Sequence, residues 1–336
     1  MADFIEVDEL TKTFPTAIGV IPWVRNFGRV ERRTALDRVS FGVRRGELFG
    51  LLGANGAGKS TILRVLAGQL VPDAGVVRVG GTDARTASLE LRRKVSLCCT
   101  DERSFYYRLT ARLNLEYFGA LVGLGGARLR GRISEVARAV DLEGDLDRRF
   151  DSFSSGMKQR LGIARALLGD PEVLIFDEPT RAVDPAHAAA IRAFVRDELV
   201  ARRGKTVLLA TNLLEEAWEL CERIAVLRRG RVAAIAPPSE LDLHAGAALR
   251  YAITIDRSDA SLLARTRAVT GLIDVQVAGD EPNVRLNVLL GPEPHALTEL
   301  LRAVSANGIC VTSVRPQERR PVEIFADLIA EQPDGR

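Results

Sequence analysis

A glycine-rich run around residue 56 has the residue types that hold phosphate groups. The run consists of Gly53, Ala54, Asn55, Gly56, Ala57, Gly58, Lys59, Ser60 and Thr61. Its spacing fits the phosphate-loop pattern, in which glycines let backbone N–H groups point at the β- and γ-phosphates without a Cβ clash. Lys59 can supply a point charge for the same oxygens, and the Ser60 hydroxyl is placed to ligate Mg²⁺. The run therefore predicts a site for a nucleoside triphosphate and its metal ion.

Two adjacent carboxylates form a second set of candidate residues. Asp177 and Glu178 follow the apolar residues Val173 to Phe176, which are typical of a short buried strand. Asp177 is suited to the Mg²⁺ shell, and Glu178 can polarise a water molecule in line with a γ-phosphate. Taken alone, such a pair is commonly part of a solvated loop. Beside a phosphate loop on a neighbouring strand, the pair becomes the metal and water half of one site.

A segment containing serine and glycine lies between these two sets. It consists of Phe153, Ser154, Ser155, Gly156 and Met157, and a helical run from Leu161 to Leu168 follows. Such a segment is a good anion-binding helix N-terminus, but it is also an everyday helix cap. The residues alone leave both interpretations open.

These candidate residues require an alternation of strands and helices to position them. An apolar strand from Leu48 to Leu52 runs into the phosphate loop, and a helix begins near Lys59. The pattern from about Thr110 to Arg149 is helical and amphipathic. A helix from Pro185 to Val200 and an apolar strand from Thr206 to Ala210 continue the alternation. This order predicts an α/β fold with a mostly parallel sheet.

The last quarter of the chain is predicted to form a separate unit. The alternation of strands and helices stops at Pro237 and Pro238. These prolines and the small residues from His244 to Ala248 predict a linker. The following segments predict a β-α-β-β-α-β order, which suggests a small α+β domain of the split βαβ type. We therefore expect a main domain over residues 1–240 and a small accessory domain over residues 246–336.

Composition and charge exclude several classes of protein. The hydrophobic fraction of 46% and the charged fraction of 27% are typical of a folded globular chain. A net charge of +3 is too small to predict nucleic-acid binding. No apolar run is long enough to cross a bilayer, and the first residues lack the build of a signal peptide. We therefore expect a cytosolic protein whose four cysteines are reduced.

The order of the three motifs resembles the ABC ATPases. The resemblance covers Ile5 to about Ala236, and the segment from Asp177 to Asp184 extends it. It implies a P-loop NTPase fold with a mixed sheet and a helical subdomain over about 105–165, and it implies ATP and Mg²⁺ as ligands. In this family the serine-glycine segment binds the γ-phosphate of ATP held by the phosphate loop of a partner subunit. It also implies a second nucleotide-binding subunit, either identical or different, and an integral membrane permease that touches the helical subdomain.

The resemblance assigns two further residues. Phe14 matches the aromatic residue that stacks on adenine, whereas the alternative is a strand residue facing the core. Asp184 matches the loop that couples the two composite sites across the dimer. Both residues are thus candidates for the nucleotide site.

Two positions depart from the family pattern. The family usually has a glutamine that senses Mg²⁺ and water before the helical subdomain. Counting back from Thr110 places Asp101 at that position here, and a different loop length would place Thr100 or Glu102 there. Asp101 could ligate Mg²⁺ directly, or it could point to solvent. Where the family places a histidine that contacts the γ-phosphate, this chain has Asn212, which can donate a hydrogen bond but cannot carry positive charge. We therefore expect Asn212 to weaken hydrolysis without abolishing ATP binding.

The resemblance points to export as the function. An insertion from Pro15 to Thr34, with several arginines, a tryptophan and a phenylalanine, resembles those of ATPases that export drugs, natural products and polysaccharides. Domains appended to such exporter ATPases resemble dimer-stabilising or regulatory modules, so the resemblance implies that role for residues 246–336. The sequence thus predicts the ATP-hydrolysing subunit of an ABC exporter, bound at the cytoplasmic face of a bacterial membrane. The alternatives are a regulatory ATP-binding protein with weak hydrolysis and a soluble ABC protein that acts on ribosomes or DNA.

Overall fold

The computed structural model describes residues 3–15, 32–86, 89–99, 104–181, 183–241, 249–279, 283–291, 293, 295–317 and 321–329. Asp101, residues 16–31 of the predicted insertion and the predicted linker residues 244–248 lie outside these ranges. The chain divides into two compact units, Met1–Pro238 and Ser239–Arg336, which are described separately. The division lies close to the boundary expected from the two prolines.

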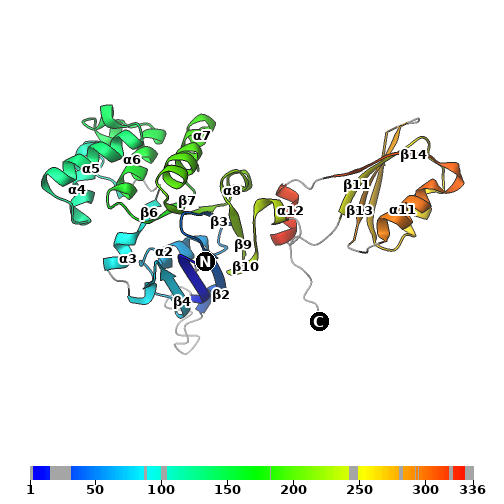
Figure 1. The fold of residues 1–336 in the computed structure, drawn as a ribbon, viewed down its shortest axis with the longest axis horizontal. Helices are drawn as coiled ribbons and strands as arrows, with labels where there is room; N and C mark the ends of the chain where they lie inside the picture. The colour runs from blue at the N-terminus through cyan, green and yellow to red at the C-terminus, as the bar shows by residue number, and fades with distance from the viewer. Residues whose placement is uncertain are drawn as a thin grey trace, which may run out of the picture. The chain divides into compact units, whose positions relative to one another are not determined.

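A six-stranded sheet forms the centre of the first unit (Figure 1). Its strand order is β10-β9-β3-β8-β7-β6, and the strands from β9 to β6 are parallel while β10 is antiparallel to β9. The strands are β3 (Leu48–Gly53), β6 (Val95–Cys99), β7 (Val173–Asp177), β8 (Thr206–Thr211), β9 (Arg223–Arg228) and β10 (Arg231–Ala236). Strands β3 and β8 are buried along their whole length, as the near-continuous apolar runs predicted. The predicted parallel α/β sheet is confirmed.

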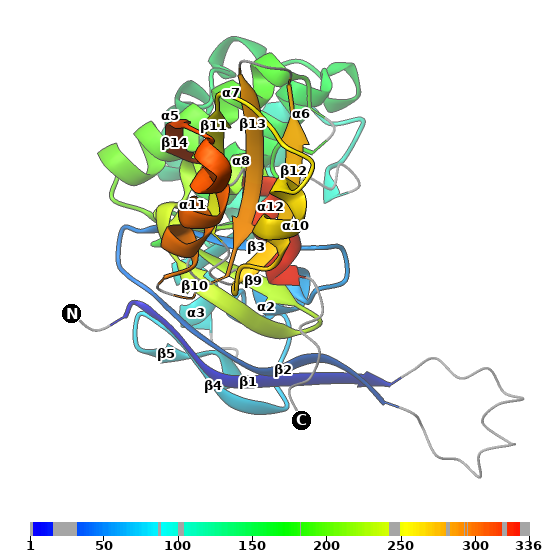
Figure 2. The same cartoon turned by 90° about the vertical axis from the view of Figure 1, so that its right-hand side faces the viewer.

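A four-stranded antiparallel sheet packs into the same unit. Its order is β2-β1-β4-β5, and its strands lie side by side in Figure 2. They are β1 (Ile5–Pro15), β2 (Arg32–Val43), β4 (Ala74–Val79) and β5 (Thr82–Asp83). Buried side chains such as Ile5, Val39 and Val77 share one apolar core with β3 and with the helix that follows it. This shared core fixes the strand ends that carry Phe14 and Arg33 relative to the phosphate loop.

Helices cover the sheet and form a subdomain at one end of the first unit (Figure 1). The helices are α2 (Lys59–Leu66), α3 (Leu89–Lys94), α4 (Ala111–Leu121), α5 (Gly126–Ala139), α6 (Ser155–Leu167), α7 (Pro185–Ala193) and α8 (Leu214–Leu220). A π-helical segment, Phe194–Arg202, continues α7. Within the helical subdomain the rings of Phe105 and Phe150 are stacked, with their centroids 4.8 Å apart. The helical subdomain predicted over about 105–165 is present in the form of α4, α5 and α6.

The second unit contains one antiparallel sheet with the order β12-β13-β11-β14. Its elements are β11 (Leu249–Ile255), α10 (Leu262–Arg267), β12 (Leu272–Ala278), β13 (Val284–Leu290), α11 (Ala296–Ser305), β14 (Val311–Pro316) and α12 (Pro321–Ile329). Up to β14 this is the predicted β-α-β-β-α-β order. Side chains such as Leu286, Leu262 and Leu300 form its core between the sheet and α10 and α11. Across the described residues of both units, no helix combines the length and apolarity needed to span a bilayer.

Candidate active site

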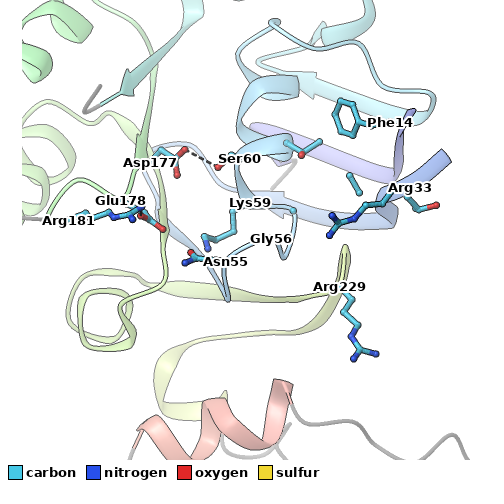
Figure 3. A pocket seen from close by; sticks show the side chains of 14 residues that line it. Phe14, Arg33, Asn55, Gly56, Lys59, Ser60, Asp177, Glu178, Arg181 and Arg229 are labelled. Atoms are coloured by element: carbon cyan, nitrogen blue, oxygen red, sulfur yellow. Dashed lines mark hydrogen bonds and ion pairs between the residues drawn. The ribbon is translucent and has the colours of Figure 1, made fainter. Parts of the chain in front are cut away.

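A cavity of about 860 Å³ opens where the two sheets of the first unit meet. It is lined by Phe14, Arg33, Thr34, Ala35, Asn55, Gly56, Gly58, Lys59, Ser60, Thr61, Asp177, Glu178, Arg181 and Arg229. In Figure 3 the two carboxylates and Arg181 lie on one side of Lys59, and Phe14, Arg33 and Arg229 lie on the other. The structure thus brings the phosphate loop, the carboxylates and Phe14 to one hollow. Gly53 and Ala57 belong to the loop but do not line the cavity.

The phosphate loop has a backbone shape that only glycine adopts easily. Gly56 and Gly58 have φ angles of 81° and 112°, in a region that side chains with a Cβ disfavour. A Cβ on Gly58 would lie 2.7 Å from a side-chain carbon of Leu36 and 3.0 Å from the carbonyl oxygen of Ala35. The spacing of these glycines therefore follows from the turn and from close packing, and it leaves the backbone exposed to the cavity.

Lys59 begins α2 and carries the charge at the centre of the cavity. Its Nζ donates hydrogen bonds to the carbonyl oxygens of Gly53, at 2.6 Å, and Ala54, at 3.3 Å. The residue is 5% exposed, and burial lowers the pKa of its ammonium group, while Glu178 and Asp177 oppose that shift. A buried cation next to a helix N-terminus is a strong site for phosphate oxygens.

Asp177 and Ser60 place two oxygen ligands side by side. The Ser60 hydroxyl donates to Oδ2 of Asp177 at 3.1 Å. Burial raises the pKa of Asp177, and the hydrogen bond from Ser60 partly offsets the shift. A hydroxyl and a carboxylate beside a phosphate site suit Mg²⁺, which prefers oxygen ligands and takes the others from water and phosphate. Among the described residues no cluster of three His, Cys, Asp or Glu could hold a metal alone, so these two residues would hold the ion together with the nucleotide.

Glu178 stands at the exposed end of β7 in a strained backbone conformation. Its φ angle is 50°, which is uncommon for a residue with a Cβ and is often found at functional sites. Its N–H donates to the carbonyl of Ala210 on β8 at 2.8 Å, and this bond holds the conformation. Its Oε2 accepts a bond from Nη1 of Arg181 at 2.9 Å, and the side chain is 14% exposed. The carboxylate thus faces the cavity from a fixed backbone position.

A buried hydrogen bond anchors the turn that follows Glu178. The Thr180 hydroxyl donates to Oε1 of Glu216 on α8 at 2.8 Å, and both residues are buried. Burial raises the pKa of the Glu216 carboxyl, and the hydroxyl groups of Thr211 and Thr180 and the charge of Arg192 oppose the shift. This contact ties the loop after β7 to the helix after β8.

Replacing Glu216 with glutamine is expected to change how stability depends on pH. The raised pKa means that the folded chain binds the proton of Glu216 more tightly than the unfolded chain does, where the ordinary value is 4.5. The stabilisation linked to this proton is complete below that value and is lost as the pH rises through the raised pKa. A neutral amide has no charge to bury. The melting temperature of Glu216→Gln relative to wild type should therefore increase from about pH 5 to about pH 8.

Thermal unfolding of both proteins across this pH range checks the prediction, with Glu215→Gln as the control. Glu215 is the neighbouring exposed residue on α8, so its replacement should give a difference from wild type that does not change with pH. A pH-independent difference for Glu216→Gln as well would contradict the linkage.

The ring of Phe14 lies at the end of the cavity away from the carboxylates. It is 37% exposed and lines the cavity, so it does not face the core of the unit. The ammonium of Lys12 lies 5.7 Å from its ring centroid. An accessible ring at this place can stack on a flat base.

The serine-glycine segment and Asp184 lie outside the cavity. Ser154 caps α6, with its hydroxyl accepting a bond from the Met157 N–H at 3.3 Å, and Ser154 and Ser155 are exposed. Gly156 is buried, and a Cβ there would lie 2.8 Å from the ring of His187. Asp184 caps α7 and accepts two bonds from His187, and the bond from its backbone N–H contributes most to lowering the pKa of Asp184. The chain therefore does not bring these residues to its own phosphate loop.

Three arginines in the cavity were not found from the sequence. Arg33, Arg181 and Arg229 come from β2, from the turn after β7 and from the β9–β10 connection. Asn212, which was predicted, is exposed directly after β8 and is not among the residues that line the cavity. The sheet topology brings Arg33 and Arg229 to the site, whereas Arg181 follows Glu178 by three residues in the same turn.

Comparisons with known proteins agree with this geometry. A family model described as ABC transporter matches residues 36–181. The linearmycin resistance ATP-binding protein LnrL of Bacillus subtilis (strain 168) is 31% identical over 297 residues, which are 88% of this chain and 94% of the relative. The daunorubicin resistance ATP-binding protein DrrA3 of Streptomyces coeruleorubidus is 35% identical over 296 residues, which are 88% and 91% of the two chains.

A solved structure shows the same fold around a nucleotide product. It is a dimeric, post-hydrolysis state of an ATP-binding cassette bound to ADP and Pi. The superposition covers 69% of this chain and 98% of the solved chain, with 27% sequence identity and a TM-score of 0.59. The similarity reaches nearly the whole of the solved cassette.

Proposed function

The chain belongs to the ABC transporter family, as an ATP-binding ATPase subunit of the exporter type, and we propose that it drives export through a separate membrane subunit. One observation carries this proposal. Lys59, Ser60, Asp177 and Glu178 meet in one cavity, while the serine-glycine segment at the start of α6 lies outside it. Such an arrangement suits two chains placed head to tail, in which each chain covers the other's nucleotide.

The cavity residues divide the work of ATP hydrolysis. Backbone N–H groups of the loop and Lys59 bind the phosphate oxygens, and Phe14 stacks on the base. Ser60 and Asp177 would hold Mg²⁺, which when bound neutralises charge on the β- and γ-phosphates. Glu178 orients a water molecule and accepts its proton as the water attacks the γ-phosphorus. ADP and phosphate are the products.

ATP is proposed to close the dimer, and loss of phosphate to open it. The exposed Ser154 and Ser155 at the N-terminus of α6 supply donors for the γ-phosphate of the partner's ATP. Asp184, exposed at the start of α7, lies on the loop that couples the two sites. Closure follows from the higher affinity of the dimer for ATP than for ADP. The second chain is proposed to be an identical copy, and a different ATPase subunit would serve the same geometry.

The permease is proposed to contact the helical subdomain from the cytoplasmic side of the membrane. A hollow of about 600 Å³ between this subdomain and β6 supports the proposal. It is lined by Ala67, Gln69, Arg92, Val95, Ser96, Leu97, Phe118 and Arg165. Its mixture of apolar and cationic side chains suits a short helix that extends from a membrane protein.

Purification of the full chain from detergent-solubilised membranes of its host tests this function. We expect an integral membrane protein with several spans to co-purify in a fixed ratio, because an ATPase subunit of the exporter type acts through a membrane subunit. The control is the same chain carrying Phe118→Asp, which places a charge in the hollow and should release the membrane protein. Recovery of ribosomes or DNA in place of a membrane protein would contradict the proposal.

One observation favours the second candidate, an ATP-binding regulator with weak hydrolysis. Asn212 cannot carry the positive charge of a histidine, and it does not line the cavity. If no other cation served the γ-phosphate, turnover would be slow.

A further inference from the structure

The cavity contains a cation that can replace the charge missing at position 212. We propose that Arg181 is a catalytic residue that stabilises the transferring γ-phosphoryl group, an inference that rests on the proposed ATPase function. Arg181 lines the cavity together with Lys59, Asp177 and Glu178. Asn212, at the end of β8, does not.

The position of Arg181 is set by a turn that is anchored at three points. The N–H of Arg181 donates to the carbonyl of Glu178 at 3.2 Å, which folds the chain back on itself. The N–H of Glu178 is bonded to Ala210, and the hydroxyl of Thr180 is bonded to Glu216. The backbone of Arg181 is thus held in place, while its side chain is 70% exposed and accessible to a ligand.

The guanidinium group lies against the carboxylate that activates water. Nη1 of Arg181 is 2.9 Å from Oε2 of Glu178, and Figure 3 shows the two side chains next to each other on the carboxylate side of the cavity. Among the described residues Glu178 is the side-chain partner of Arg181. A guanidinium has five N–H donors, so it can keep this contact and still donate to a phosphate oxygen.

The chemistry of hydrolysis requires a cation at this place. The water oxygen bonds to the γ-phosphorus, the bond from that phosphorus to the bridging oxygen breaks, and its electron pair leaves with ADP. The proton of the water goes to Glu178. Negative charge is spread over the γ-phosphate oxygens as this happens, and a planar guanidinium matches two such oxygens.

The other cations of the cavity are placed differently. The Nζ of Lys59 donates a hydrogen bond to the carbonyl oxygen of Gly53 in the phosphate loop. Arg33 and Arg229 lie beyond it, in the half of the cavity that contains Phe14 (Figure 3). Arg181 is therefore the cation on the side of Glu178, where the attacking water must lie.

The test measures kcat and the Kd for ATP separately in Arg181→Ala. We expect kcat to fall at least about 100-fold, the effect of removing a catalytic arginine, while the Kd changes less than about threefold. The exposed side chain leaves no buried void, so the melting temperature should not change. Arg196→Ala is the matched control, because Arg196 pairs with Asp197 on the π-helical segment outside the cavity and its loss should leave kcat within about twofold.

A second variant distinguishes charge at the γ-phosphate from a general disturbance of the loop. Arg181→Lys should keep a kcat at least about tenfold above that of Arg181→Ala, because it retains a positive charge at the same place in the cavity. An Arg181→Ala chain with wild-type kcat, or one that has lost ATP binding, would overturn the inference. A wild-type chain that releases no phosphate would instead contradict the proposed function.

Discussion

Replacing Glu178 with glutamine is expected to stop ATP turnover while ATP binding is retained. The glutamine has the same shape and keeps a hydrogen-bond acceptor toward Arg181, but it cannot take the proton of the attacking water. Lys59, Ser60 and the loop backbone are untouched, so the phosphate site stays intact. A loss of about 100- to 10,000-fold in kcat is the size expected for removal of a general base.

Trapping of the ATP-bound state is the second consequence of this variant. Without hydrolysis the dimer closed by ATP cannot return to separate chains, so Glu178→Gln should run as a dimer on size exclusion when ATP is present. Glu172→Gln is the matched control, because Glu172 lies just before the other end of β7 and pairs with Arg45 outside the cavity. A glutamine variant that hydrolyses ATP at the wild-type rate would remove Glu178 from the mechanism.

Replacing Lys59 with alanine is expected to remove ATP binding itself. The ammonium is nearly buried and is the charge at the centre of the cavity, where charge interactions are stronger than in water. We expect the Kd for ATP to rise at least about 100-fold, which corresponds to about 2.8 kcal/mol of lost binding free energy.

Titration with a fluorescent ATP analogue checks this expectation. Lys205→Ala is the control, because Lys205 pairs with Asp170 outside the cavity and its loss should leave nucleotide affinity unchanged. Tight ATP binding by the Lys59→Ala chain would show that the nucleotide lies elsewhere.

The local parts of the site could be predicted from the sequence because each is contiguous along the chain. The phosphate loop combines a strand, glycines with positive φ angles and a helix start within Leu48–Leu66. Asp177 and Glu178 follow an apolar run that is recognisable as a buried strand. In both cases short-range order fixes the geometry, so residue types and spacing are enough.

The long-range parts of the site could not be predicted in this way. Arg33 and Arg229 reach the cavity only because β2 shares a core with β3 and because β9 pairs with β3. The Thr180 to Glu216 bond joins residues 36 positions apart, through two loops whose packing no periodicity reveals. For the serine-glycine segment, the residues show only a helix cap, and its role across a dimer came from the family resemblance.

The same contrast between local and long-range signals applies to the domain boundary and to the departure from the family at Asn212. Two prolines and a change of strand pattern are local signals, and they predicted a division close to Pro238. The expected effect of Asn212 concerns one position, whereas Arg181 lines the cavity beside Glu178 and is proposed to supply a cation there. If the proposal holds, Arg181 offsets the charge missing at Asn212, although only the folded turn shows that its side chain reaches the cavity.

Phosphate release measured on wild-type and Glu178→Gln chains loaded to the same ATP occupancy is the most direct test of the account. We predict steady release of one phosphate per ATP from the wild-type chain, and no release above background from the variant, although both hold ATP equally. Equal release from the two chains, or none from the wild-type chain with ATP bound, would contradict the assignment of this cavity as an ATPase site.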